Sequence, residues 1–100
     1  MDSQDEVAAF LSTHDLHAPP AYRLLDLVAE VGELAGDATE STDYGARPTA
    51  LSIRDDELGD ALFTLLALAD ALEMDAGAAL ETSLEKYESR IADTGSPDST

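Results

Sequence analysis

Length, composition and charge restrict the classes of protein to which this chain can belong. The chain has 100 residues, the size of one domain, and its 22 acidic residues against 5 basic ones give a net charge of −17. Proteins that bind nucleic acid or anionic membranes need basic patches, so this charge excludes both classes. The chain has no cysteine, which excludes disulfides and thiolate metal sites.

So acidic a chain is either a disordered segment or a folded protein adapted to high salt. Apolar residues recur at helical spacing over residues 20–40 and 53–92, a pattern that disordered acidic chains lack. We therefore expect a folded, salt-adapted protein. The first residues are acidic, unlike those of a signal peptide, and no uncharged apolar run has membrane-spanning length, so we expect a cytoplasmic location.

The first half of the chain predicts two helices. Ser3, with Glu6 three residues later, has the pattern of a capping box and predicts a short helix through Leu11. The connection that follows ends at two prolines, which favour a helix start directly after them. The second helix is predicted over residues 21–39, where apolar residues form a stripe along one face and acidic residues form an adjacent stripe.

The third predicted helix follows a loop over residues 41–51. Ser52 is expected to cap this helix, which ends near Glu73. Residues 61–72 are apolar on nearly every side, and a helix of that kind is buried on every side. Because 100 residues are too few to surround it, we expect a homo-oligomer to complete its burial.

The fourth predicted helix is capped by Asp75 and ends near Ala92, before a polar tail over residues 93–100 that we expect to be disordered. No strand-like alternation is found along the chain. The predicted fold class is therefore all-α, with a four-helix bundle-like protomer that oligomerisation completes.

Two pairs of acidic residues lie within the apolar runs. Glu30 and Glu33 belong to the second predicted helix, and Glu57 and Asp60 belong to the third. Residues three apart share one face of a helix, where like charges repel each other. Two such pairs on neighbouring helices indicate a cation between them, and carboxylate ligands suit Mg²⁺, with Mn²⁺ as an alternative.

The two motifs together resemble those of a known family. Glu30-x-x-Glu33, then 23 intervening residues, then Glu57-x-x-Asp60, is similar to the MazG-like, all-α nucleoside triphosphate pyrophosphohydrolases. The flanking segments agree, and the resemblance covers residues 20–92. It implies one helical domain over residues 1–92, a homodimer or homotetramer, and Mg²⁺-dependent cleavage of a (deoxy)nucleoside triphosphate to the monophosphate and pyrophosphate.

The resemblance also implies roles for individual residues. The four acidic residues of the motifs would be catalytic metal ligands, and Lys86 and Arg90 would contact the phosphates of the substrate. Arg47, in the middle loop, is a further candidate for phosphate contact because arginine suits bidentate phosphate recognition. Arg54 is instead expected to pair with its acidic neighbours Asp55 and Asp56.

Two alternative functions remain open. The family often has a second glutamate directly before its first ligand, where this chain has Ala29. Asp26 or Asp37, on the same helical face, could substitute for that glutamate, although we interpret both as surface acids. Ala29 keeps open a non-catalytic, cation-binding helical module for dimerisation or interaction. The charge alone would also allow an acidic mimic of nucleic acid that binds a basic protein.

Overall fold

The structure, a computed structural model, describes residues 2–98, which form four α-helices and one short 3₁₀-helix and contain no β-strand. The predicted all-α, four-helix protomer is confirmed. The elements in chain order are α1 (Asp2–Thr13), α2 (Pro20–Ser41), η1 (Pro48–Ala50), α3 (Asp55–Ala71) and α4 (Ala76–Thr94).

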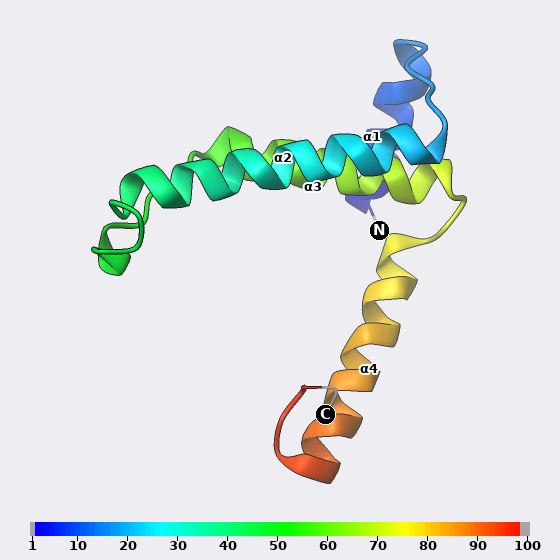
Figure 1. Ribbon diagram of the computed structural model, residues 1–100. Coiled ribbons are helices and arrows are strands. Elements are labelled where there is room, and N and C mark those ends of the chain that lie inside the picture. The colour runs from blue at the N-terminus through cyan, green and yellow to red at the C-terminus, as the bar shows by residue number, and fades with distance from the viewer. Residues whose placement is uncertain (1, 99–100) are drawn as a thin grey trace.

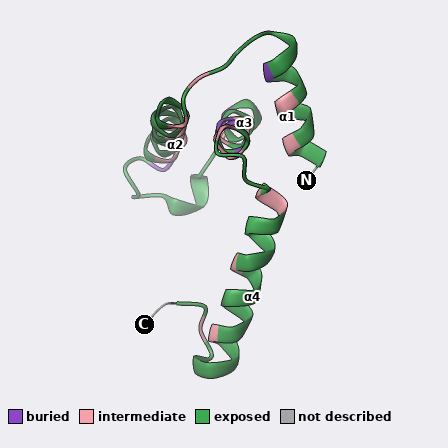
Figure 2. Cartoon of the chain, turned by 90° about the vertical axis from the view of Figure 1, so that its right-hand side faces the viewer, coloured by how far each residue is buried: buried purple, intermediate pink, exposed green. Residues whose placement is uncertain are grey.

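Three of the helices pack together and the fourth extends away from them. α2 and α3 lie side by side and antiparallel, joined at one end by the loop that contains η1 (Figure 1). A view turned by 90° shows α3 between α2 and α1, with α4 projecting away from this group (Figure 2). Completion of the bundle by a second copy of the chain stays a prediction.

The buried apolar centre of the protomer is small and lies around α3. Leu66 and Ala67 of α3 and Leu11 of α1 are the buried apolar residues among those described. Beside them the ring of Phe10 meets Phe63 edge to face, with centroids 5.7 Å apart, a favourable aromatic geometry. This core joins α1 to α3, and α3 also packs along α2, the other helix that carries an acidic motif.

A proline begins α2, and a side-chain hydrogen bond followed by a turn with positive φ angles ends it. Pro20 begins the helix, where a missing N–H costs nothing. At the other end, the buried Thr42 donates its hydroxyl to the carbonyl oxygen of Ala38 at 2.6 Å. Asp43, Tyr44 and Gly45 then adopt positive φ angles, which turn the chain out of the helix and toward α3.

The predicted helix caps are partly confirmed. Asp75 caps α4, because its Oδ1 atom accepts a hydrogen bond from the backbone N–H of Ala78 at 3.0 Å. Ser52 does not cap α3, which begins at Asp55 after Arg54; the backbone N–H of Ser52 donates instead to Oγ of Ser41. Ser3 lies inside α1 rather than before it, so the expected capping box is wrong too.

The C-terminal segment is partly helical. α4 continues to Thr94, two residues beyond its expected end, and Gly95 terminates it with a φ of 78°. Residues 95–98, within the predicted disordered tail, form bends, and Arg90 donates to the carbonyl oxygen of Pro97 at 3.2 Å. The last two residues of that predicted tail, 99 and 100, lie outside the described range.

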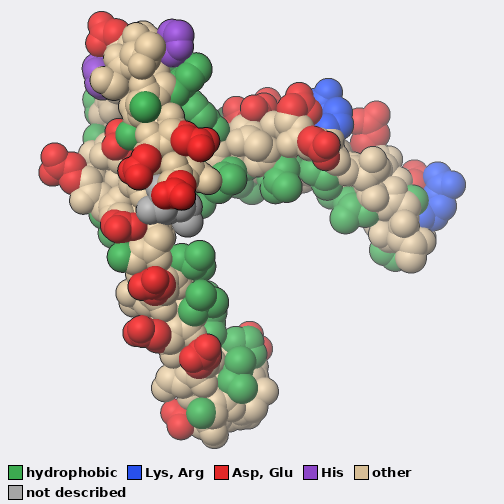
Figure 3. Space-filling model, turned by 180° about the vertical axis from the view of Figure 1, so that it is seen from behind, with side chains coloured by type: hydrophobic (Ala, Val, Ile, Leu, Met, Phe, Trp, Pro, Cys, Tyr) green, Lys and Arg blue, Asp and Glu red, His purple; other side chains and the backbone are tan. Residues whose placement is uncertain are grey.

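The protomer leaves much apolar surface uncovered. Hydrophobic side chains line one face of the α2–α3 pair and the adjoining side of α4, on the inside of the corner between them (Figure 3). Leu62 of α3 is 49% exposed and Leu84 of α4 is 50% exposed. Over residues 2–98, none of the helices combines the length and apolarity that crossing a bilayer demands.

Candidate metal centre

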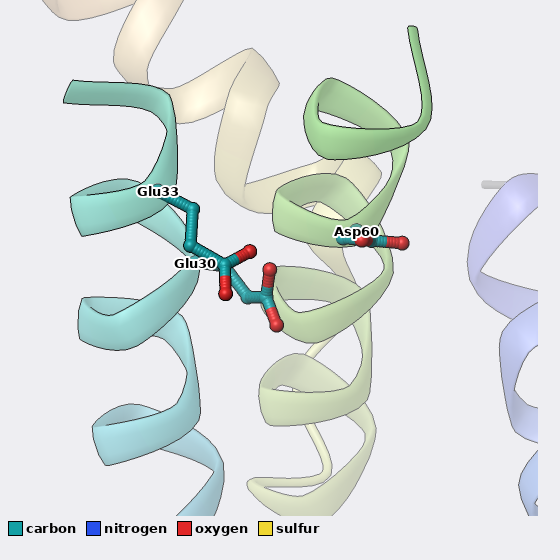
Figure 4. A group of neighbouring side chains, drawn as sticks. All are labelled: Glu30, Glu33 and Asp60. Atoms are coloured by element: carbon teal, nitrogen blue, oxygen red, sulfur yellow. The ribbon is translucent and has the colours of Figure 1, made fainter. Parts of the chain in front are cut away.

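Three of the predicted ligands converge between two helices. Glu30 and Glu33 of α2 and Asp60 of α3 each offer one carboxylate oxygen, and the three oxygens lie within 4.8 Å of one another. Figure 4 shows Glu30 and Glu33 extending from α2 toward α3. Within residues 2–98, no basic side chain forms an ion pair with any of these three carboxylates.

This arrangement results from helix spacing and from the pairing of α2 with α3. Glu30 and Glu33 are one helical turn apart and share a face. Asp60 lies on the neighbouring antiparallel helix, and its backbone carbonyl accepts a hydrogen bond from the Thr64 hydroxyl at 2.9 Å. Because Thr64 is buried, this part of α3 is held within the helix pair.

Glu30 is a partly buried carboxylate surrounded by like charges. Its Oε2 atom is buried and has no hydrogen-bond partner. Burial raises the pKa of Glu30 above its ordinary value of 4.5, and a hydrogen bond shared with Glu33 and the nearby charges of Glu33, Asp60 and Asp26 raise this pKa further. A divalent cation would supply the missing partner and offset the repulsion, so the three carboxylates fit Mg²⁺ or Mn²⁺.

Glu57, the fourth predicted ligand, contributes no oxygen to this group of three carboxylates. It is only 6% exposed, and its Oε1 atom accepts a hydrogen bond from the Arg54 guanidinium. Arg54 also lies 4.0 Å from Asp56, so its expected pairing with acidic neighbours is confirmed for Asp56. The structure thus brings three of the four predicted ligands together and pairs the fourth with an arginine.

Asp37, which we interpreted as a surface acid, lies against Glu57. Its Oδ2 atom accepts the backbone N–H of Arg54 at 3.4 Å. A proton shared with Asp37 raises the pKa of Glu57, whereas the Arg54 guanidinium acts in the opposite direction. The same shared proton lowers the pKa of Asp37. When both groups are ionised, Glu57 Oε2 is buried without a hydrogen-bond partner.

An open pocket of ≈ 360 Å³ adjoins two of the three carboxylates. Its lining comprises Arg23, Asp26, Glu30, Asp60, Phe63 and Thr64. Arg23 is not among the residues predicted from the sequence to contact phosphate, and its guanidinium donates to the carbonyl oxygen of Leu16 at 2.6 Å. Its position seven residues before Glu30, hence on the same helical face, is the signal that could have identified it.

The basic residues predicted to contact phosphate lie elsewhere in the protomer. Lys86 and Arg90 are on α4, where Lys86 Nζ lies 5.0 Å and Arg90 Cζ lies 6.0 Å from the centre of the Tyr87 ring. Arg47 lies in the loop that follows α2, directly before η1. One protomer therefore does not bring these three residues to the pocket, and their role in phosphate contact stays a prediction.

Comparisons of the chain with protein-family models, with curated proteins and with solved structures give no match. The resemblance to the MazG-like family therefore depends on the residues of the two motifs. Those residues lie on the two helices that the structure pairs, and three of them form the acidic group between these helices.

Proposed function

We propose that the protein is a Mg²⁺-dependent nucleotide pyrophosphohydrolase that cleaves (deoxy)nucleoside triphosphates to the monophosphate and pyrophosphate. The observation that carries the proposal is the convergence of Glu30, Glu33 and Asp60 from two helices, with the buried Oε2 atom of Glu30 lacking a partner. The reaction class comes from the resemblance of the motifs to the MazG-like family. A cytoplasmic location in a salt-adapted cell belongs to the same proposal.

In this proposal the chain holds the ion and orients the substrate. Glu30, Glu33 and Asp60 bind Mg²⁺ in the nucleotide-free protein, whereas Glu57, predicted from the sequence as the fourth ligand, is paired with Arg54. When bound, Mg²⁺ neutralises phosphate oxygens and lowers the pKa of a coordinated water. Arg23, at the pocket beside Glu30 and Asp60, is placed to contact phosphate oxygens of a triphosphate that enters there.

The test is pyrophosphate release from a panel of unmodified and damaged nucleoside triphosphates, in molar KCl with Mg²⁺. We expect release that stops when Mg²⁺ is removed and that Glu33→Gln abolishes. Glu85→Gln makes the same charge change at an exposed position on α4 and should leave the rate unchanged. Absence of release from every triphosphate, with circular dichroism showing a helical protein in the same buffer, would refute the catalytic proposal.

A second candidate is the non-catalytic, cation-binding module that assembles with copies of itself. A compact monomer of 10.5 kDa would expose about 5,400 Å². The protomer exposes 7178 Å² of accessible surface, which is about 1,700 Å² more than a compact monomer would expose. This excess is larger than the roughly 800 Å² that each partner buries in a standard protein–protein interface. Its radius of gyration of 16.6 Å also exceeds the roughly 13 Å of a compact domain of this length.

Self-association is part of both candidates. Exposed hydrophobic side chains gather on the α2–α3 face and along α4 (Figure 3), where a homodimer or homotetramer would bury them. An apolar pocket of ≈ 330 Å³ between the end of α3 and the start of α4 has no titratable residue in its lining, so we assign it to this surface and not to the metal centre. Pyrophosphate release separates the two candidates, because only the first predicts turnover.

A further inference from the structure

Arg54 is the basic residue that the structure places against the predicted fourth ligand. It directly precedes α3, and its guanidinium pairs with Glu57 while its backbone N–H donates to Asp37. Asp37 comes from α2 and Glu57 from α3, so this group spans the same helix pair as the metal centre. It lies toward the end of the pair that carries the connecting loop, beyond Glu33 and Asp60 along the two helices.

The charges of Asp37, Glu57 and Arg54 leave one net negative charge on this group, in which Glu57 is buried and Asp37 is partly exposed. Glu57 is more than nine-tenths buried, and its Oε2 atom has no partner when Asp37 is also ionised. A buried carboxylate of this kind needs a proton or a cation. Arg54 is the cation that the chain itself supplies, and its side chain is 67% exposed, so it reaches Glu57 from the solvent side.

We propose that Arg54 is a positioning residue that supplies the positive charge at Glu57 and Asp37, so that the nucleotide-free protein binds one divalent ion, at Glu30, Glu33 and Asp60, instead of two. An arginine and a divalent ion compete for the same carboxylate because each desolvates it and neutralises its charge. Without the guanidinium, Asp37 and Glu57 become a second acidic site. The inference extends the proposed function, since it assumes ion binding at the three converging carboxylates.

The experiment measures Mn²⁺ stoichiometry by electron paramagnetic resonance of free Mn²⁺, in molar KCl to suppress ions held by the general negative charge. We expect one bound ion for the wild-type chain and two for Arg54→Gln. Arg54→Lys should restore a stoichiometry of one, because the lysine keeps the positive charge. Arg90→Gln makes the same charge change on α4 and should also bind one ion.

The location of the second ion is tested by combining substitutions. Arg54→Gln with Glu57→Gln should return the stoichiometry to one, whereas a merely structural role of Arg54 predicts no change in stoichiometry in either variant. In the wild-type background, Glu57→Gln should leave the affinity for the first ion within about twofold, and loss of that ion would overturn the inference. This second variant provides the test should Arg54→Gln fail to fold.

Failure of the inference and failure of the proposed function give different results. A wild-type chain that binds no Mn²⁺ contradicts the metal centre itself, and with it the proposed function. A wild-type chain that binds two ions, or an Arg54→Gln chain that is folded and binds one, overturns the role of Arg54 while leaving the metal centre intact.

Discussion

Substitution of Asp60 by asparagine tests the geometry of the metal centre most directly. Asp60 is the one member of the three converging carboxylates that comes from α3, so an ion bound by all three links α2 to α3. Without Asp60, the remaining ligands Glu30 and Glu33 belong to a single helix. The variant should therefore lose most of the stabilisation that an ion gives to the folded chain.

The expected size of the effect follows from linkage. An ion that binds only the folded chain, at a free concentration one hundred times its dissociation constant, stabilises that chain by about 2.7 kcal/mol. For a domain of this length, each kcal/mol raises the melting temperature by roughly 4–8 °C, so saturating Mn²⁺ should raise it by roughly 10–20 °C. We expect less than about half of this increase for Asp60→Asn.

Without metal, Asp60→Asn should not lower the melting temperature as it does in Mn²⁺. The charge of Asp60 contributes to the raised pKa of Glu30, which means that the three carboxylates repel one another when no cation is present. Asp60→Asn should therefore melt at the same temperature as the wild type or higher in a chelator, and lower in Mn²⁺. Asp93→Asn, the same change at an exposed site on α4, should follow the wild type in both buffers. If Asp60→Asn and the wild type gain equally from Mn²⁺, Asp60 is not a ligand.

Two further measurements test the environment of Glu30 and the uncovered apolar face. The pKa of Glu30 is raised in the folded chain, so the folded state takes up this proton at a pH where the unfolded state remains ionised. The free energy of unfolding of the metal-free protein should therefore rise as the pH falls toward 4.5. Thermal melts in chelator should show a smaller rise for Glu30→Gln. Leu84→Glu should reduce the molar mass in light scattering to that of one protomer, whereas Ser89→Glu should not; an unchanged mass for Leu84→Glu would exclude α4 from the interface.

Local signals account for the parts of the fold that the sequence predicts correctly. The two prolines at the start of α2 and the apolar periodicity of α2 and α3 depend on residues a few positions apart, so the sequence alone shows them. The cap at Asp75 is local in the same sense. The cap expected at Ser52 was wrong because a tertiary contact competes: the Ser52 backbone N–H bonds the Ser41 side chain at the end of α2, and α3 begins three residues later.

The candidate site divides in the same way between local and distant interactions. That Glu30 and Glu33 share one face follows from helical spacing alone, as it does for Glu57 and Asp60. Which members of the two pairs meet depends on how α2 and α3 are aligned along each other. That alignment places Asp60 with the first pair and Glu57 against Asp37. Arg54 was expected to pair with its nearest acidic neighbours, and spacing alone did not identify the buried Glu57 as its partner.

The sequence by itself therefore determined the helical class, the approximate extent of each helix and the acidic character of one face of α2 and α3. These properties depend on backbone propensity and on a repeat of 3.6 residues, both of which act within a few turns. Only the tertiary structure decided that three carboxylates converge, that Arg54 pairs with the fourth, and that α4 projects from the helix group with apolar side chains exposed (Figures 2 and 3). Those outcomes depend on packing between segments distant in the chain, where burial and charge pairing outweigh local preference.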